Sequence, residues 1–131
     1  MNYPQTILLT DDEPHIRKFI SLILRAFDNP RILEASDGAQ AVAMYKEHQP
    51  DLVLLDVNMP NMDGVQALAA IQELDDTAVV VMLTSLANRQ TIEECQRLGA
   101  VDYIRKDTPR DEMKAKFERI IAECYGSEVP S

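Results

Sequence analysis

Four apolar residues run directly into an aspartate in the stretch LVLLD, residues 52–56. A short, continuous apolar run of this kind is typical of a strand that is buried on both faces of a parallel sheet. Three further apolar runs also end at polar side chains. The polar residues at the four run ends are Asp11 and Asp12 after residues 6–10, Asp56, Thr84 after residues 79–83, and Lys106 after residues 101–105. Ligands bind outside the carboxyl ends of the strands in open α/β sheets, so we expect these side chains to share one site.

Segments with the 3.6-residue period of a helix separate the apolar runs, and a short Ile32-Leu33 run adds another strand, so the pattern predicts five strand–helix units. The first predicted helix has the clearest apolar stripe and should stop at Asp-Asn-Pro, residues 28–30. The stripe consists of Ile16, Phe19, Ile20, Ile23, Leu24 and Phe27. The fifth predicted helix should begin with Thr108 as its N-cap and Pro109 in its first position.

The fourth predicted helix, near residues 88–98, has a thin apolar face formed by Ile92, Cys95 and Leu98. A helix with so few apolar anchors is expected to be mobile. Cys95 and Cys124 have no His or Cys neighbours at metal-binding spacing, so we interpret both as small apolar residues inside helices.

Strands that are joined by crossover helices pair in parallel through right-handed connections. We therefore expect an α/β fold, with a doubly wound, five-stranded parallel sheet in strand order 2-1-3-4-5 and the three-layer, flavodoxin-like (βα)5 arrangement. The switch point of that order lies between the first and third strands, where Asp11, Asp12 and Asp56 would lie side by side. The length of 131 residues suits one domain, expected over residues 1–125, with a short C-terminal tail at residues 126–131.

The composition narrows the classes of partner. The formal net charge is −9, and direct nucleic acid binding by this chain is not expected because it needs a concentrated basic patch. Basic protein surfaces are better partners for an acidic chain. No apolar stretch approaches the ~20 residues of a membrane span, and the first residues lack the basic and apolar regions of a signal peptide. We therefore expect a cytoplasmic protein that does not contact membranes.

Clustered carboxylates repel one another until a cation enters, and Mg²⁺ typically takes one or two carboxylates, water and a phosphate. Asp11 and Asp12 alone are explained equally well as a turn followed by a helix N-cap. Asp56 favours the metal site, because a strand-end aspartate followed by a valine is poorly placed to serve a turn. Its carboxylate can attack a phosphoryl group and form an acyl phosphate, while Lys106 balances the charge and Thr84 donates a hydrogen bond. The pattern thus predicts a phosphoryl-accepting magnesium site.

Four motifs resemble those of the receiver domains of two-component response regulators, and the resemblance covers nearly the whole chain. The motifs are LTDDEP at residues 9–14, LLDVNMPNMDG at residues 54–64, VMLTS at residues 81–85 and DYIRK at residues 102–106. The resemblance implies that Asp56 is the phosphoacceptor. It also implies that Asp11, Asp12 and Asp56 hold Mg²⁺ directly or through water, with the backbone carbonyl of Asn58 completing the metal shell.

The resemblance further implies a conformational switch. Lys106 would contact the phosphoryl group, while Thr84 and Tyr103 would form the switch pair. Asn58 and Leu86, each two positions beyond a site residue, flank the path of a hydrolytic water and are expected to tune the lifetime of the phosphoryl group.

The resemblance also implies partners. The expected phosphodonor is a sensor histidine kinase or a phosphotransfer protein, and the output is a downstream protein partner or a fused output domain. A phosphorylation-dependent homodimer would use the same output face, formed by the fourth helix, fifth strand and fifth helix. A single-domain regulator of the chemotaxis type and an excised receiver both fit this chain. Many receivers have proline after the lysine, whereas Lys106 meets Asp107, which leaves the cis or trans state of that bond open.

Three alternatives compete with this interpretation. An aspartate-nucleophile phosphatase of the haloacid dehalogenase type needs a second acid two residues after its nucleophile, where this chain has Asn58. A flavin-binding module would offer hydroxyls and amides after the first strand, whereas Asp11 and Asp12 repel a bare phosphate. A receiver that binds partners without phosphorylation stays open, although every chemical position is filled. We therefore expect a switch that phosphorylates and slowly dephosphorylates only itself, not a turnover enzyme.

Overall fold

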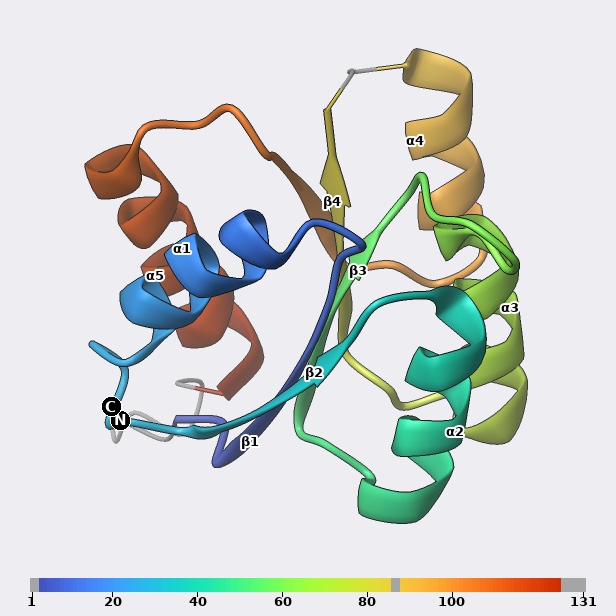
Figure 1. Ribbon diagram of the computed structural model, residues 1–131, viewed down its shortest axis with the longest axis horizontal. Helices are drawn as coiled ribbons and strands as arrows, with labels where there is room; N and C mark the ends of the chain where they lie inside the picture. Colours follow the sequence, from blue (N-terminus) through green and yellow to red (C-terminus); the bar gives the residue numbers. More distant parts are fainter. Residues whose placement is uncertain (1–2, 86–87, 126–131) are drawn as a thin grey trace.

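Strands and helices alternate along the chain in the computed structural model, which describes residues 3–85 and 88–125 (Figure 1). The strands are β1 (Thr6–Thr10), β2 (Arg31–Ala35), β3 (Leu52–Asp56), β4 (Val80–Thr84) and β5 (Asp102–Arg105). The helices are α1 (Pro14–Leu24), α2 (Gly38–His48), α3 (Gly64–Leu74), α4 (Arg89–Arg97) and α5 (Arg110–Tyr125). The predicted strand–helix units are thereby confirmed.

The strands form one parallel sheet in the order β2-β1-β3-β4-β5, as predicted. In its register, Asp56 of β3 pairs with Leu83, and Thr84 of β4 pairs with Arg105. The ladder continues past the strand ends, because the Lys106 amide donates to the Thr84 carbonyl at 2.8 Å. The polar residues that follow the strands therefore lie along the same edge of the sheet.

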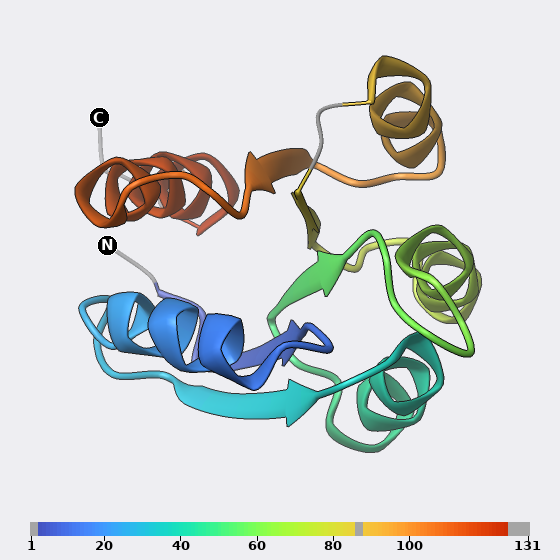
Figure 2. The same cartoon turned by 45° about the horizontal axis from the view of Figure 1, so that its top comes forward.

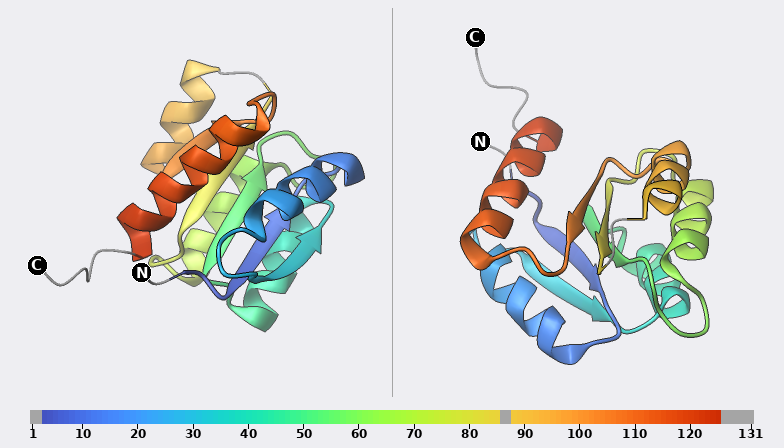
Figure 3. Two further views of the ribbon diagram at one scale, coloured as in Figure 1. Left: turned by 90° about the vertical axis from the view of Figure 1, so that its left-hand side faces the viewer. Right: turned by 90° about the horizontal axis from the view of Figure 1, so that it is seen from above.

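Helices cover both faces of the sheet, which gives three layers (Figures 1 and 2). α1 and α5 lie on one face and α2, α3 and α4 on the other, as Figure 3 also shows from above. Each face has its own apolar core: Ile20 and Phe117 belong to the first, and Leu68 and Met82 to the second. The two cores fix the sheet between the helices and hold its carboxyl edge in place.

Most helices begin at residues with good capping chemistry. Asp37 caps α2 by accepting from the Gln40 amide, and Asn88 caps α4 by accepting from the Thr91 amide. α3 begins with a reciprocal capping box between Asp63 and Gln66. Each cap uses residues close together in the sequence, and it fixes the point at which the preceding loop ends and the helix begins.

Two predicted helix boundaries are wrong by a few residues. α1 ends at Leu24, and Phe27 reaches the same core from the following turn. α5 begins at Arg110, and the Thr108 hydroxyl donates to the Arg105 carbonyl at 2.6 Å, so Thr108 closes the preceding turn instead of capping the helix. In both cases a short hydrogen-bonded turn, not the helical period, sets the boundary.

α4 has the weakest anchoring of the helices, since Cys95 is its one buried residue. The predicted thin apolar face is thereby confirmed. Cys95 and the half-buried Cys124 both have free thiols. Within residues 3–85 and 88–125, no helix is long and apolar enough to cross a membrane.

Candidate functional site

Asp56 lies at the carboxyl end of β3 and is 1% exposed. Its Oδ1 accepts a hydrogen bond from the Asn58 amide at 3.2 Å, and its Oδ2 lies 3.2 Å from Nζ of Lys106. Burial and the charge of Asp11 raise the pKa of Asp56 to about 7, although Lys106 and the Asn58 amide act in the opposite direction. Without a cation, the ionised form of this carboxylate is therefore disfavoured.

The acidic pair after β1 lies beside Asp56, as predicted. Asp11 is buried and Asp12 is exposed, and the carboxylates of Asp11, Asp12 and Asp56 each place one oxygen within 4.8 Å of the others. The set offers only hard oxygen donors, the ligands that Mg²⁺ prefers. The chemistry of the residues present therefore fits a magnesium ion.

The alternative of a turn with a helix cap explains only the turn in this pair. The N-cap of α1 is Glu13, with Pro14 in the first turn, so neither aspartate caps the helix. Asp11 Oδ1 accepts from the Glu13 amide at 2.9 Å, which fixes the turn, while Oδ2 lies 2.9 Å from Nζ of Lys106. The carboxylate is thus aimed into the site.

Lys106 reaches the acid cluster from the loop after β5, with only 7% of its side chain exposed. Its Nζ lies 2.9 Å from Asp11 Oδ2, 2.9 Å from Glu13 Oε1 and 3.2 Å from Asp56 Oδ2. Burial alone would lower the pKa of Lys106, but the hydrogen bonds and charges of these carboxylates raise it above its usual value. The amine is therefore held as an ammonium ion. Peptide bonds in the described ranges are trans, including Lys106–Asp107.

Glu13 and Arg17 also belong to the site, although sequence reasoning missed them. The hydrogen bond and charge of Lys106 lower the pKa of Glu13. Arg17 Nη1 donates to the Asp11 carbonyl at 2.7 Å, and its Nε bonds Glu34 at 2.8 Å. The acid directly after the aspartate pair was a weak signal for Glu13. No sequence pattern pointed to Arg17 on α1, whose partner Glu34 lies on β2.

The loop after β3 folds back over Asp56. The Gly64 amide donates to the Val57 carbonyl at 2.9 Å and closes the loop at the start of α3. A Cβ atom at Gly64 would lie 2.0 Å from the Asp56 carbonyl oxygen. Only glycine permits this close approach of α3 to the end of β3.

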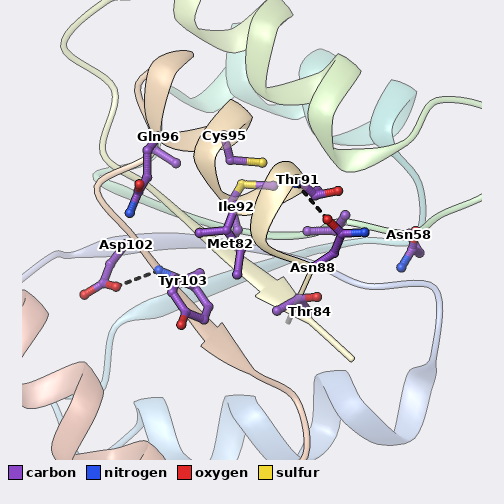
Figure 4. A pocket seen from close by; sticks show the side chains of 12 residues that line it. Asn58, Met82, Thr84, Asn88, Thr91, Ile92, Cys95, Gln96, Asp102 and Tyr103 are labelled. Atoms are coloured by element: carbon purple, nitrogen blue, oxygen red, sulfur yellow. Dashed lines mark hydrogen bonds between the residues drawn. The ribbon is translucent and has the colours of Figure 1, made fainter. Parts of the chain in front are cut away.

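Thr84 and Tyr103 line one pocket, of about 200 Å³, between α4 and the strands β4 and β5. Thr84 is buried at the end of β4 and Tyr103 is partly buried on β5. Figure 4 shows Met82, Ile92 and Cys95 between the sheet and the helix, with Thr84 and Tyr103 on the sheet side. Asn58 lines the same pocket. The predicted lifetime residue Leu86 and the predicted tail at residues 126–131 lie outside the described residues.

Solved structures with this fold include chains of known signalling proteins. The chain superimposes with a TM-score of 0.84 on a chain of the CheX–CheY–BeF3–Mg²⁺ complex from Borrelia burgdorferi, at 33% identity, over 94% of this chain and 90% of that chain. It also matches the response regulator domain of CheB from Thermotoga maritima with a TM-score of 0.81, at 27% identity, over 91% of this chain and 94% of that chain.

Sequence relatives give the same result. The chain is 39% identical over 105 residues to the chemotaxis protein CheY of Bacillus subtilis, which covers 80% of this chain and 88% of that protein. Residues 7–118 match the family model of the response regulator receiver domain. Because that match runs from β1 into α5 and includes the acid cluster of Asp11, Asp12 and Asp56, this chain belongs to the response regulator receiver domains.

Proposed function

We propose that Asp56 accepts a phosphoryl group and that the chain acts as a phosphorylation-dependent switch. The observation that carries the proposal is a buried carboxylate at the end of β3, 3.2 Å from the Lys106 ammonium and beside two further acids. A carboxylate in this position can attack phosphorus and form an acyl phosphate. The family of the chain supports this role, since receiver domains are signalling modules.

The phosphodonor is a phosphohistidine of a sensor histidine kinase or a phosphotransfer protein, or a small acyl phosphate. An Asp56 oxygen forms the new O–P bond while the P–N bond of the phosphohistidine breaks. The imidazole leaves with the bonding electrons, and a proton held on its other ring nitrogen makes the departing histidine neutral. Negative charge builds on the phosphoryl oxygens, and the Lys106 ammonium lies where it can balance that charge.

Asp11, Asp12 and Asp56 would hold Mg²⁺, with the Asn58 carbonyl as a further ligand. When bound, Mg²⁺ neutralises charge on the carboxylates and on the phosphoryl oxygens. Asp56 must be ionised to attack, and its pKa of about 7 leaves a large share of the cation-free protein protonated at neutral pH. A cation at the cluster therefore favours the reactive form of Asp56.

Thr84 and Tyr103 transmit the event to the surface. The phosphoryl dianion attracts the Thr84 hydroxyl, and the movement of Thr84 gives the Tyr103 ring access to the pocket beneath α4. Because α4 has one buried anchor, Cys95, its position responds to what fills that pocket. The phosphoryl group acts by fitting one of two pre-existing states better than the other.

The output face is formed by α4, β5 and α5 and binds a downstream protein, a fused output domain or a second copy of the chain. The chain catalyses only its own phosphorylation and slow dephosphorylation, in the cytoplasm where kinases supply phosphohistidine. Asn58 and Leu86 tune the decay rate. The presence of Asn58 in place of an acid separates this site from a turnover phosphatase, because an amide cannot activate water as a base.

Labelling with a small acyl phosphate tests the proposal. With Mg²⁺, one acid-labile and base-labile phosphoryl group should form on Asp56, located by mass spectrometry. Asp56→Asn keeps the shape of the side chain and should abolish labelling. Equal labelling of the Asn variant, or labelling that persists after the metal is chelated, would contradict the assignment.

A further inference from the structure

Glu13 places its carboxylate on Lys106, although it stands at the position of a helix cap. Its Oε1 lies 2.9 Å from Nζ of Lys106, and 46% of its side chain is exposed. Its side chain makes no capping hydrogen bond to α1. The carboxylate is therefore available to Lys106 and is not committed to the end of the helix.

The Lys106 ammonium forms ion pairs with three carboxylates, those of Asp11, Glu13 and Asp56, and donates hydrogen bonds to Glu13 and Asp56. Two of these, Asp11 and Asp56, also belong to the acid cluster, whereas Glu13 does not. A metal at the cluster takes up oxygens of Asp11 and Asp56. Glu13 is then the one partner of the ammonium, among the three, that does not serve the metal.

We infer that Glu13 is a positioning residue, which holds Lys106 beside Asp56 while the two aspartates serve the metal and the phosphoryl group. The inference rests on the proposed function of Asp56. Lysine is long and flexible, and a charge-assisted hydrogen bond to a fixed carboxylate restricts its ammonium to the site. The Glu13 side chain lies at the solvent edge and has room to move. It can therefore stay in contact with the Lys106 ammonium when that ammonium also binds a phosphoryl oxygen.

Two variants of Glu13 separate the effect of side-chain length from the effect of its charge. Glu13→Gln keeps the length of the side chain and removes its charge, whereas Glu13→Asp keeps the charge and is one methylene shorter. If Glu13 positions Lys106 by a direct charged hydrogen bond, both variants should weaken that interaction. Glu118→Gln, on the exposed face of α5, is the control for net charge.

Two readouts are taken on the full chain at saturating Mg²⁺. The first is solvent exchange of the Lys106 ammonium hydrogens, measured by ¹⁵N-edited NMR, which needs no phosphoryl group. The second is the rate of Asp56 labelling by a small acyl phosphate. Both Glu13 variants should exchange several-fold faster and label several-fold more slowly than the wild-type chain and Glu118→Gln.

Unchanged ammonium exchange in Glu13→Gln would overturn the inference, because Glu13 would then not hold Lys106. Wild-type behaviour of Glu13→Asp would overturn it as well, since charge alone would be sufficient. Faster labelling of either variant would show that Glu13 restrains the lysine instead of positioning it. A wild-type chain that is not labelled would defeat the proposed function, while the exchange measurement would still decide the role of Glu13.

Discussion

The buried ammonium of Lys106 lies among the carboxylates of Asp11, Glu13 and Asp56. Buried charges are costly unless they are paired, and removal of one partner leaves the other unpaired. Burial and, secondly, repulsion by Asp11 raise the pKa of Asp56 despite the nearby lysine. At the scale of residues, the site is thus poised to take up either a proton or a divalent cation.

The stability of the metal-free protein should depend on pH through Asp56. Its pKa is about 7 in the folded chain against an ordinary value of 3.8, so between these values the folded state binds more protons than the unfolded state. The free energy of unfolding should therefore fall as pH rises from 4 through 7, with a slope that approaches about 1.4 kcal/mol per pH unit. Denaturant titrations with a chelator present measure this slope. Asp56→Asn should remove it, and a slope that persists in that variant would assign it to other groups.

The two acids after β1 should respond differently to substitution. Asp12 is exposed, so Asp12→Ala should relieve repulsion and raise the stability of the metal-free chain by a few tenths of a kcal/mol. The same variant should lose much of the thermal shift produced by Mg²⁺. Asp11→Ala should instead destabilise the chain, because Asp11 pairs with Lys106 and holds the Glu13 amide. Melting curves with and without Mg²⁺ distinguish these results, and a persistent Mg²⁺ shift in Asp12→Ala would exclude it as a ligand.

At the scale of elements, the junction between β3 and α3 holds the site together. The loop between them is closed by the Gly64 amide on the Val57 carbonyl and by the capping box of Asp63 and Gln66. The close approach of Gly64 to the Asp56 carbonyl makes the start of α3 part of the support for the phosphoacceptor. Changes in this loop should therefore affect both stability and the geometry of Asp56.

Gly64→Ala should destabilise the chain by about 1–3 kcal/mol, because its Cβ would clash with the Asp56 backbone and force α3 away from β3. Labelling of Asp56 should slow at the same time. Ala70→Gly, later in the same helix, is the control: it should cost about 1 kcal/mol from helix propensity and leave the labelling rate unchanged. Urea unfolding and labelling rates are compared between the two variants. Normal labelling of Gly64→Ala would show that the junction between β3 and α3 does not hold Asp56 in position.

At the scale of the whole molecule, the least anchored helix lies next to the switch residues. α4 is held by one buried side chain above a pocket that Thr84 and Tyr103 share, whereas α1 and α5 pack on an extensive core. Elements with few buried contacts open at low free energy. A change at Asp56 should therefore be transmitted toward α4 and β5 more than toward α1 and α2.

Backbone amide exchange, measured with and without beryllium fluoride and Mg²⁺, tests this asymmetry. Protection should change chiefly between Thr84 and Lys106 and in the first turns of α5, where the output face lies. Asp56→Asn treated with the same reagents is the control and should show no change. A response confined to α1 and α2 would refute this placement of the output face.

The sequence was sufficient for the parts of the protein that local physics controls. Apolar runs and helical periods gave the strand order, because crossover connections and buried strands leave few arrangements of five strand–helix units. The strand-end rule gave Asp11, Asp12, Asp56, Thr84 and Lys106, since residues that follow parallel strands meet at one edge of the sheet. The predicted helix ends at Thr108 and Phe27 are wrong, because short hydrogen-bonded turns flank both helices and the apolar period does not distinguish such a turn from helix.

Only the tertiary structure decided how the charges at that edge are shared. Glu13 and Lys106 are 93 residues apart in the chain, and Arg17 and Glu34 come from different elements, so no local pattern encodes their contacts. The pKa of Asp56 likewise depends on its burial and on the distance to Asp11 in space. The sequence by itself determined which groups reach the edge of the sheet. The packing of α1 and the β5–α5 loop around Asp56 determined which of them touch, because electrostatic interactions between groups depend on distance and burial and not on separation along the chain.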